Sequence, residues 1–317
     1  MSASTPAAAG MRFGLSAPGF NDPAQLVARA RWAESNGFAT FAVSDHLNGA
    51  SPFVTLQAIA SATATIRLGT LVINNDFRHP AVLAQDAATV DLLSDGRLEL
   101  GIGAGWARAE YERAGLAYDP PAVRIERLRE TVTVLRTLFS GELATAEGPH
   151  MTLRGHYTTP RPPQGGGLPL LIGGNGTRLL TLAAEQADIV GFTGFSPDRE
   201  GHNQPTHFTR SGLADRVALV RRASAHRERP PELNLLLQSL TITDDRDYLA
   251  HTLAQRRNAS PIEMLTCPFL AFGTVEEICG QLLRLRDEHG ITYITVFNPY
   301  ADDAAQVIAA LPAFDSL

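Results

Sequence analysis

The segment Ser44-Asp45-His46 places a carboxylate and an imidazole side by side directly after a short apolar run. Histidine titrates near neutral pH, so at the end of a strand it can donate or accept a substrate proton. The alternative is a hydrogen-bonded Asp–His pair that only organises a loop. His46 is therefore the candidate catalytic residue, with Asp45 as its neighbour.

Two glycine-rich segments follow other apolar runs, Gly101-Ile-Gly-Ala-Gly-Trp106 and Gly173-Gly174-Asn175-Gly176. Glycines let the backbone approach a ligand closely and expose N–H groups, which suits a phosphate or a flat ring. The second segment also precedes an expected helix, whose N-terminus attracts anions. The first lacks the third glycine and the later acidic residue of a dinucleotide-binding fingerprint. Tight strand-to-helix turns have the same composition, so that interpretation stays open.

Other kinds of catalytic site lack their usual residues. No His-x-His pair ends the first apolar run and the nine histidines form no ligand set, so we expect no metal. The Gly-x-Ser-x-Gly elbow of serine hydrolases is missing as well. Cys267 and Cys279 are too few for a disulfide framework and are not spaced as a CxxC site, so we expect reduced, structural thiols.

Eight apolar runs qualify as the strands that must position these residues. They are Phe13–Ser16, Thr40–Ser44, Arg67–Ile73, Arg97–Ile102, Pro169–Ile172, Ile189–Thr193, Leu233–Thr241 and Tyr293–Phe297. Amphipathic segments between them predict βαβ units with a parallel sheet, and eight strands are the number that closes a barrel. We therefore predict an α/β fold, a single (β/α)8 TIM barrel over residues 11–317, after a flexible N-terminal tail at residues 1–10. The loops after the strands would then share one end of the barrel.

Local signals mark the helices between the strands. Asp22 is a candidate N-cap with Pro23 at the first helical position, and Gly37 follows the expected end of that helix. Thr274 and Glu277 have the spacing of a capping box. These signals support the alternation of strands and helices.

Bulk composition describes an ordinary globular protein of 317 residues, 44% hydrophobic and 19% charged, with a net charge of −6. All 27 basic residues are arginines and no long basic run occurs, so we expect no nucleic-acid partner. No apolar stretch reaches the roughly 18 residues of a membrane span, and the first ten residues lack a signal-peptide pattern. We expect a cytoplasmic protein that does not enter a membrane.

Taken together and in order, several segments resemble the luciferase-like monooxygenase superfamily, specifically its coenzyme F420-dependent branch. They are Phe41-Ala-Val-Ser-Asp-His46, Leu68-Gly-Thr-Leu-Val72, Arg78-His-Pro-Ala-Val82, Leu93-Ser-Asp-Gly-Arg-Leu-Glu-Leu-Gly101, Gly103-Ala-Gly-Trp106 with Glu110-Tyr111, and Leu170-Leu-Ile-Gly-Gly174 with Ala187-Asp188. The similarity runs from about Met11 to the C-terminus. It implies a single barrel, usually dimeric, that holds a flavin or deazaflavin in its strand-end mouth.

The resemblance also implies roles for individual residues. His46 would act in proton transfer beside the reactive ring, Asp45 would contact the ring, and a non-proline cis peptide at Leu71–Val72 would back it. The other expected cofactor-binding residues follow the third to sixth strands: Ile73, Asn74, Asn75, Gly103, Ala104, Gly105, Trp106, Gly173, Gly174, Asn175, Gly176, Thr193 and Gly194. Candidate partners for the negatively charged cofactor tail are Arg78, Arg108 and Arg178, for which a role on the surface is the alternative.

Two features depart from the family pattern. Trp106 stands where some sugar-phosphate-oxidising relatives have a glutamate, so their substrate is not carried over. Long loops are expected at about Gly141–Leu168 and Phe195–Ser211, and the polar insertion Ser196–Arg210 within the second, which contains His202 and His207, has no clear family equivalent and is a candidate lid.

The implied function is that of an F420-dependent oxidoreductase, which transfers a hydride between a deazaflavin and a small organic substrate. Its implied assembly is a homodimer. One alternative is an FMN-dependent luciferase-like monooxygenase, because reduced deazaflavin reacts poorly with oxygen whereas reduced flavin does not. A non-catalytic flavin- or deazaflavin-binding protein is another. An unrelated barrel lyase or isomerase, with a phosphorylated substrate at Gly173–Gly176, is the third.

Overall fold

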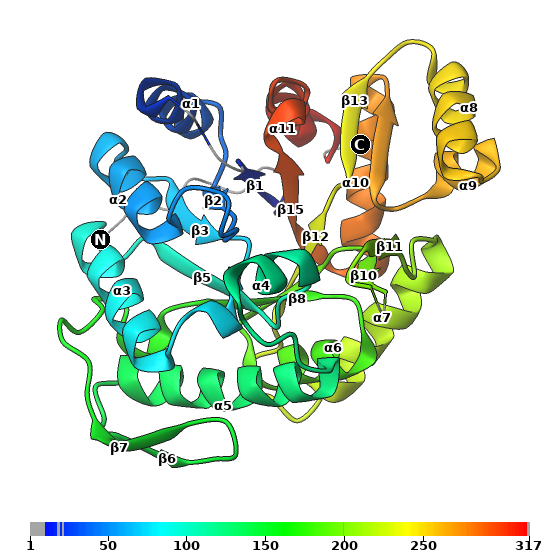
Figure 1. Cartoon of the computed structure of the whole chain (residues 1–317). Coiled ribbons are helices and arrows are strands. Elements are labelled where there is room, and N and C mark those ends of the chain that lie inside the picture. Colours follow the sequence, from blue (N-terminus) through cyan, green and yellow to red (C-terminus); the bar gives the residue numbers. More distant parts are fainter. Residues whose placement is uncertain (1–9, 18–19, 21, 199, 316–317) are drawn as a thin grey trace.

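Eight parallel strands form a closed barrel in the computed structural model, which describes residues 10–17, 20, 22–198 and 200–315. Each barrel strand pairs with the next along the chain, β3 pairs directly with β5, and β15 returns to β1. The strands are β1 (Arg12–Ser16), β2 (Thr40–Val43), β3 (Arg67–Thr70), β5 (Leu98–Gly103), β8 (Leu170–Gly174), β9 (Ile189–Phe192), β12 (Glu232–Leu236) and β15 (Ile291–Phe297). The predicted (β/α)8 barrel is confirmed (Figure 1).

Helices surround the barrel and bury its outer face (Figure 1). All six residues of β5 are buried, as expected of a parallel strand that is covered on both faces. The helices are α1 (Pro23–Ser35), α2 (Pro52–Ala62), α3 (Pro80–Leu93), α4 (Arg108–Ala114), α5 (Pro121–Phe139), α6 (Thr177–Gln186), α7 (Arg210–Ala223), α8 (Arg246–Arg257), α9 (Pro261–Thr266), α10 (Val275–His289) and α11 (Ala301–Phe314). Among the helices of the described part of the chain, none is long and apolar enough to cross a membrane.

The predicted helix signals are present. The Asp22 side chain accepts a hydrogen bond from Ala24 N at 2.9 Å at the start of α1, and Gly37 adopts a positive φ just beyond its end. Thr274 and Glu277 form the complete capping box of α10. Of the expected tail at residues 1–10, all but Gly10 lies outside the described residues.

Two of the predicted strands are wrong in extent. The run Leu233–Thr241 is two strands, because after β12 the chain leaves the barrel and β13 (Ser239–Ile242) pairs instead with β14 (Leu270–Gly273), a strand that was not predicted. The run Arg67–Ile73 is also divided, into β3 and the short β4 (Ile73–Asn74). Pairing is interrupted between them at Leu71–Val72, where the peptide bond is cis as expected.

The two stretches expected to be long loops contain antiparallel hairpins. Within Gly141–Leu168, β6 (Ala144–Glu147) pairs with β7 (Thr152–His156), and the short 3-10 helix η2 (Gly165–Gly167) follows. Buried apolar side chains of this stretch, among them Ala144 and Leu153, join the hydrophobic core, which explains why it is ordered against the barrel. The second stretch holds β10 (Phe195–Pro197) and β11 (Asn203–Pro205).

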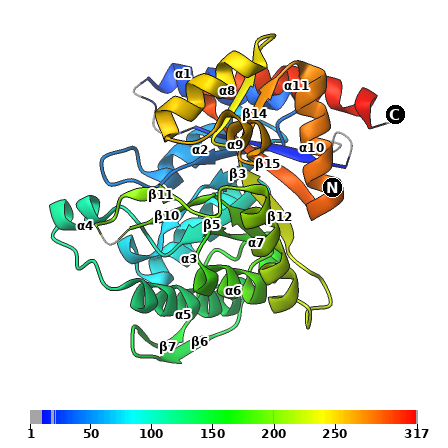
Figure 2. The same ribbon diagram turned by 90° about the vertical axis from the view of Figure 1, so that its right-hand side faces the viewer.

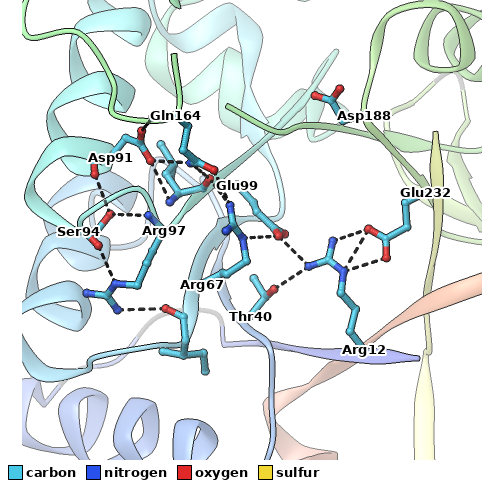
Figure 3. A network of polar contacts seen from close by, with 12 residues as sticks. Arg12, Thr40, Arg67, Asp91, Ser94, Arg97, Glu99, Gln164, Asp188 and Glu232 are labelled. Atoms are coloured by element: carbon cyan, nitrogen blue, oxygen red, sulfur yellow. Dashed lines mark hydrogen bonds and ion pairs between the residues drawn. The ribbon is translucent and has the colours of Figure 1, made fainter. Parts of the chain in front are cut away.

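A network of charged residues around the buried Glu99 closes the N-terminal end of the barrel (Figure 3). Arg12 donates to Glu232 at 2.6 Å and to Glu99 at 2.7 Å, while Arg67 lies 2.6 Å from the same Glu99 carboxylate. The Arg12 guanidinium also lies 3.7 Å from the centre of the Tyr293 ring. The four ion-paired residues come from the starts of four strands, β1, β3, β5 and β12, so the network joins strands that are distant in the sequence.

Both cysteines are free and buried. Burial raises the pKa of Cys267 to about 12 and that of Cys279 to about 11. Neither thiol is therefore suited to act as a thiolate, in keeping with the structural role expected for them.

Candidate active site

A cavity of about 610 Å³ opens at the carboxyl ends of the barrel strands. Most of the residues predicted to form the site line it: Asp45, His46, Leu71, Val72, Ile73, Asn74, Gly103, Ala104, Gly105, Trp106, Gly173, Gly174, Asn175, Gly176 and Thr193. Asn75 and Gly194 are not among the lining residues. Asn75 is buried at the start of the 3-10 helix η1 (Asn75–Phe77), and Gly194 turns with φ +70° against the Phe208 ring.

Asp45 is held by the loop that follows the third strand. Its carboxylate accepts hydrogen bonds from Arg78 at 2.5 and 3.2 Å and from the backbone N–H of Asn74 at 3.0 Å. The Asp45 side chain is buried, and a fork-shaped guanidinium contact of this kind is geometrically specific. Asp45 thus connects the end of the second strand to the loop after the third, and this fixes the backbone position of the neighbouring His46.

None of the three arginines expected to bind a cofactor tail lines the cavity. Arg78 is paired with Asp45, and Arg108 pairs with Glu112 at 2.8 Å on the surface of α4. Arg178 is exposed at the start of α6. None of the three is therefore placed to contact a ligand inside the cavity, and a role toward a cofactor tail outside it stays a prediction.

His46 forms a close pair with Glu110. Its Nδ1 lies 2.6 Å from Glu110 Oε1, and the other carboxylate oxygen accepts from Leu47 N at 3.4 Å. A carboxylate can only accept, so Nδ1 is the protonated nitrogen and Nε2 is left to exchange a proton with a ligand. The side chains are 35% and 14% exposed, and the Trp106 ring meets the imidazole edge-on at 6.1 Å between centroids.

Glu110 was not predicted as a site residue, although it lines the same cavity. It lies in the first turn of α4, which begins two residues after Trp106. This turn brings the glutamate close to the end of the second strand, where His46 lies. The one sequence signal was its position in the Glu110-Tyr111 pair of the family-like segment. Spacing could not show its partner, because His46 is 64 positions away in the chain.

Arg124 of α5 holds the loop from Gly103 to Trp106 in place through hydrogen bonds to its backbone, a contact called here the Arg124 clamp. This guanidinium is 2% exposed and donates to the carbonyl oxygens of Ala104, at 2.8 Å, and of Gly105. It also donates to Asp119 O at 2.9 Å and to the Tyr118 hydroxyl at 3.1 Å. Arg124 lines the cavity and was not predicted, since its helical surroundings carry no local signal of a partner in the loop.

Gly105 is required at the point where this loop turns. Its φ is +73°, and a Cβ there would collide with the Tyr111 hydroxyl and the Asn74 side chain. Tyr111 lies 2.9 Å from Asn74 Oδ1 and 3.0 Å from Asp76 Oδ2 through that hydroxyl. Burial, with the adjacent Asp76 carboxylate, raises the pKa of Tyr111 well above its usual range. The neutral phenol therefore supports the loop through its hydrogen bonds.

The Gly173–Gly176 loop leads into α6, whose N-terminus has no side-chain cap. Uncapped N–H groups at a helix start attract anions. Arg216 of α7 reaches this point and donates to Thr177 Oγ1 at 2.9 Å, while its Nε is buried without a partner. Arg216 is thus a further cation beside this loop, in addition to Arg178 in the first turn of α6.

The hairpin β10–β11 covers one side of the cavity. Phe195, Ser196, Pro197 and Asn203 line it, and the hairpin turn at Gly201 packs against Trp106 O and the Arg108 side chain. In Figure 2 the hairpin and α4 lie together on the same side of the molecule. The candidate lid therefore lines the cavity, and whether it opens and closes stays a prediction.

Comparisons with known proteins place this architecture. The chain is 35% identical over 158 residues, 50% of its length and 46% of the relative, to a 5,10-methylenetetrahydromethanopterin reductase of Archaeoglobus fulgidus. It is 35% identical over 179 residues, 52% of each chain, to an F420-dependent glucose-6-phosphate dehydrogenase of Rhodococcus erythropolis. The matches thus span about half the length of these curated relatives.

Among solved structures, the fold is similar to that of the coenzyme F420-dependent tetrahydromethanopterin reductase of Methanopyrus kandleri, with a TM-score of 0.74. That match covers 95% of this chain and 97% of the other at 19% identity, so it concerns the fold. Residues 11–265 match the family model described as luciferase-like monooxygenase, and the chain belongs to this family.

Proposed function

We propose that the protein is an F420-dependent oxidoreductase in which a hydride passes between a deazaflavin and a small organic substrate. The observation that carries the proposal is the His46–Glu110 pair, which lies at the rim of a strand-end cavity that two glycine loops also enter. The names of the F420-dependent relatives support the choice of cofactor.

The residues present fit a ring with a phosphorylated side chain. Gly173 and Gly174 leave backbone open to the cavity, and Asn175 has a buried Oδ1 without a partner that can accept from a ligand hydroxyl. The uncapped start of α6 with Arg216 nearby would hold the phosphate. The cis Leu71–Val72 segment and Asn74 would lie along the ring.

When bound, the deazaflavin would supply the two-electron chemistry by accepting or giving a hydride. His46 would take or give the proton that accompanies the hydride, through Nε2. Glu110 would hold the imidazole in the tautomer with Nδ1 protonated, and Trp106 would limit the ring's rotation. The walls of the cavity would exclude water from the reacting atoms.

Separate titrations of the purified protein with F420 and with FMN, followed by fluorescence, test the cofactor. Saturable binding of F420 is expected. Tight binding of FMN with no binding of F420 would replace the proposal by the second candidate, an FMN-dependent monooxygenase, which the name of the family favours.

The catalytic role of His46 is tested with the His46→Ala variant, loaded with the cofactor that the titrations identify. A positioned acid–base group supplies about 10²- to 10⁴-fold in rate, so turnover should fall by an amount in this range while cofactor affinity is retained. His226→Ala, an exposed histidine after α7, is the matched control. Turnover of His46→Ala at the wild-type rate would remove His46 from the mechanism, and binding without any turnover by the wild type would indicate a non-catalytic carrier.

A further inference from the structure

The part of the cavity left for the substrate is the region lined by the ends of three adjacent strands, called here the substrate sector. The proposed function, on which this inference rests, assigns the ends of β3 to β9 to the cofactor. The remaining strands β12, β15 and β1 are consecutive in the barrel, and β1 pairs with β2, which leads to His46. Their contribution to the cavity is Ser16, Asn234, Leu236, Gln238 and Phe297.

This sector offers no charge to a ligand. None of its five residues is ionisable. Among the described residues that line the whole cavity, Arg124 is the one lysine or arginine, and its donors are engaged by loop carbonyls and Tyr118. The two lining carboxylates, Asp45 and Glu110, are paired with Arg78 and His46. An ionised phosphate or carboxylate in this sector would therefore be buried without a counter-charge, which is strongly unfavourable.

The sector does provide a buried hydrogen-bond acceptor that has no partner within the protein. Asn234 of β12 is 1% exposed, and its Nδ2 donates to Thr295 Oγ1 at 2.8 Å and to Tyr293 O at 3.2 Å. These two contacts orient the amide, so Oδ1 is the atom left without a partner, and Asn234 lines the cavity. A buried acceptor of this kind selects a ligand with an O–H or N–H donor.

We propose that the substrate is an uncharged, hydroxyl-bearing molecule with an apolar body, bound over β12, β15 and β1. Leu236 and Phe297 contact its apolar part, and Asn234 Oδ1 accepts from a donor group. The sector lies next to the strand that leads to His46, which places the substrate within the same chamber as the acid–base pair. Substrates that carry a phosphate, such as glucose 6-phosphate, are excluded by the same chemistry.

The test uses a probe pair that differs in charge, cyclohexanol and trans-4-hydroxycyclohexanecarboxylate, added to the cofactor-loaded protein and followed by cofactor fluorescence and turnover. Cyclohexanol should bind about 100-fold or more tightly than the carboxylate. Equal or tighter binding of the carboxylate, or binding of neither probe by loaded protein, would overturn the inference. Failure of the protein to load with any deazaflavin or flavin would instead overturn the proposed function, so the two failures are distinct.

Three variants sharpen the result. Leu236→Arg introduces the missing counter-charge and should improve binding of the carboxylate about tenfold or more relative to cyclohexanol. Ile262→Arg adds the same charge on α9, where Ile262 is 71% exposed, and should leave the preference unchanged. Asn234→Leu should weaken cyclohexanol about tenfold with unchanged cofactor affinity. A loss of cofactor affinity in Asn234→Leu would overturn the assignment of this amide to the substrate.

Discussion

The imidazole of His46 and the carboxylate of Glu110 lie 2.6 Å apart, although the two residues are 64 positions apart in the chain. The contact joins the end of the second strand to the first turn of α4. It determines which nitrogen of His46 is protonated, because the carboxylate can accept from Nδ1 but cannot donate to it. Glu110 is therefore a positioning residue for the proposed acid–base group.

Glu110→Gln should lower kcat about tenfold or more, which is part of the roughly 10²- to 10⁴-fold that a positioned acid–base group supplies. The amide can present either an N–H or a carbonyl to Nδ1, so the required tautomer is no longer enforced. KM and cofactor affinity should change little, and steady-state kinetics separates the two effects. Glu112→Gln on the same helix is the control, and a Glu110→Gln enzyme with wild-type kcat would exclude the positioning role.

Arg124→Met should destabilise the protein by about 2–4 kcal/mol, because the carbonyls of Ala104 and Gly105 lose a buried charged donor. The loop that they belong to lines the cavity, so cofactor affinity should fall as well. Urea unfolding and cofactor titration measure the two effects. Arg129→Met on the same helix removes only half-exposed ion pairs and should cost less than about 1 kcal/mol. Equal effects of both variants would contradict the clamp.

Glu99→Leu should destabilise the protein by about 3–5 kcal/mol, because it leaves Arg67 and part of Arg12 without their buried partner (Figure 3). Cofactor affinity should be retained, since this network lies at the opposite end of the barrel from the cavity. Chemical denaturation and titration of the same preparations check both statements. Glu288→Gln, which removes an exposed pair with Arg210, serves as the control. A large fall in cofactor affinity for Glu99→Leu would show that the two ends are coupled.

Glu34→Gln should remove a contribution to the free energy of unfolding that is present at neutral pH and lost at acid pH. Burial by itself would raise the pKa of the Glu34 carboxyl, but hydrogen bonds from the backbone N–H groups of Thr65, Ile66 and Ala64 outweigh it and hold the pKa below the ordinary 4.5. Because the folded pKa is the lower one, the contribution is complete above about pH 4.5 and is lost as the pH falls through the folded value.

The expected difference between wild type and Glu34→Gln is about 1 kcal/mol at pH 7, after allowance for the solvent exposure of this carboxylate. Urea unfolding of both proteins between pH 7 and pH 3 measures it. The difference should shrink toward zero at the acid end. A difference that stays constant across this range would show that the hydrogen bonds of Glu34 are not linked to its ionisation.

Much of the fold could be predicted from local sequence. The eight barrel strands are short apolar runs, and helix ends such as Asp22 and the Thr274–Glu277 box are marked by neighbouring residues. The strand Leu233–Thr241 was predicted too long because its apolar character continues while its pairing changes from β15 to β14. The apolar composition of a segment indicates that it is buried, but it does not indicate with which strand the segment pairs.

The sequence by itself predicted the eight strands of the barrel, the strand-end position of Ser44-Asp45-His46 and the two glycine loops, because residues close together in the chain mark each of them. Tertiary structure alone decided what those residues contact. It paired His46 with Glu110, engaged Asp45 with Arg78, and brought Arg124 and Arg216 to the two glycine loops. These choices depend on side chains from separate βα units that meet only when the barrel closes.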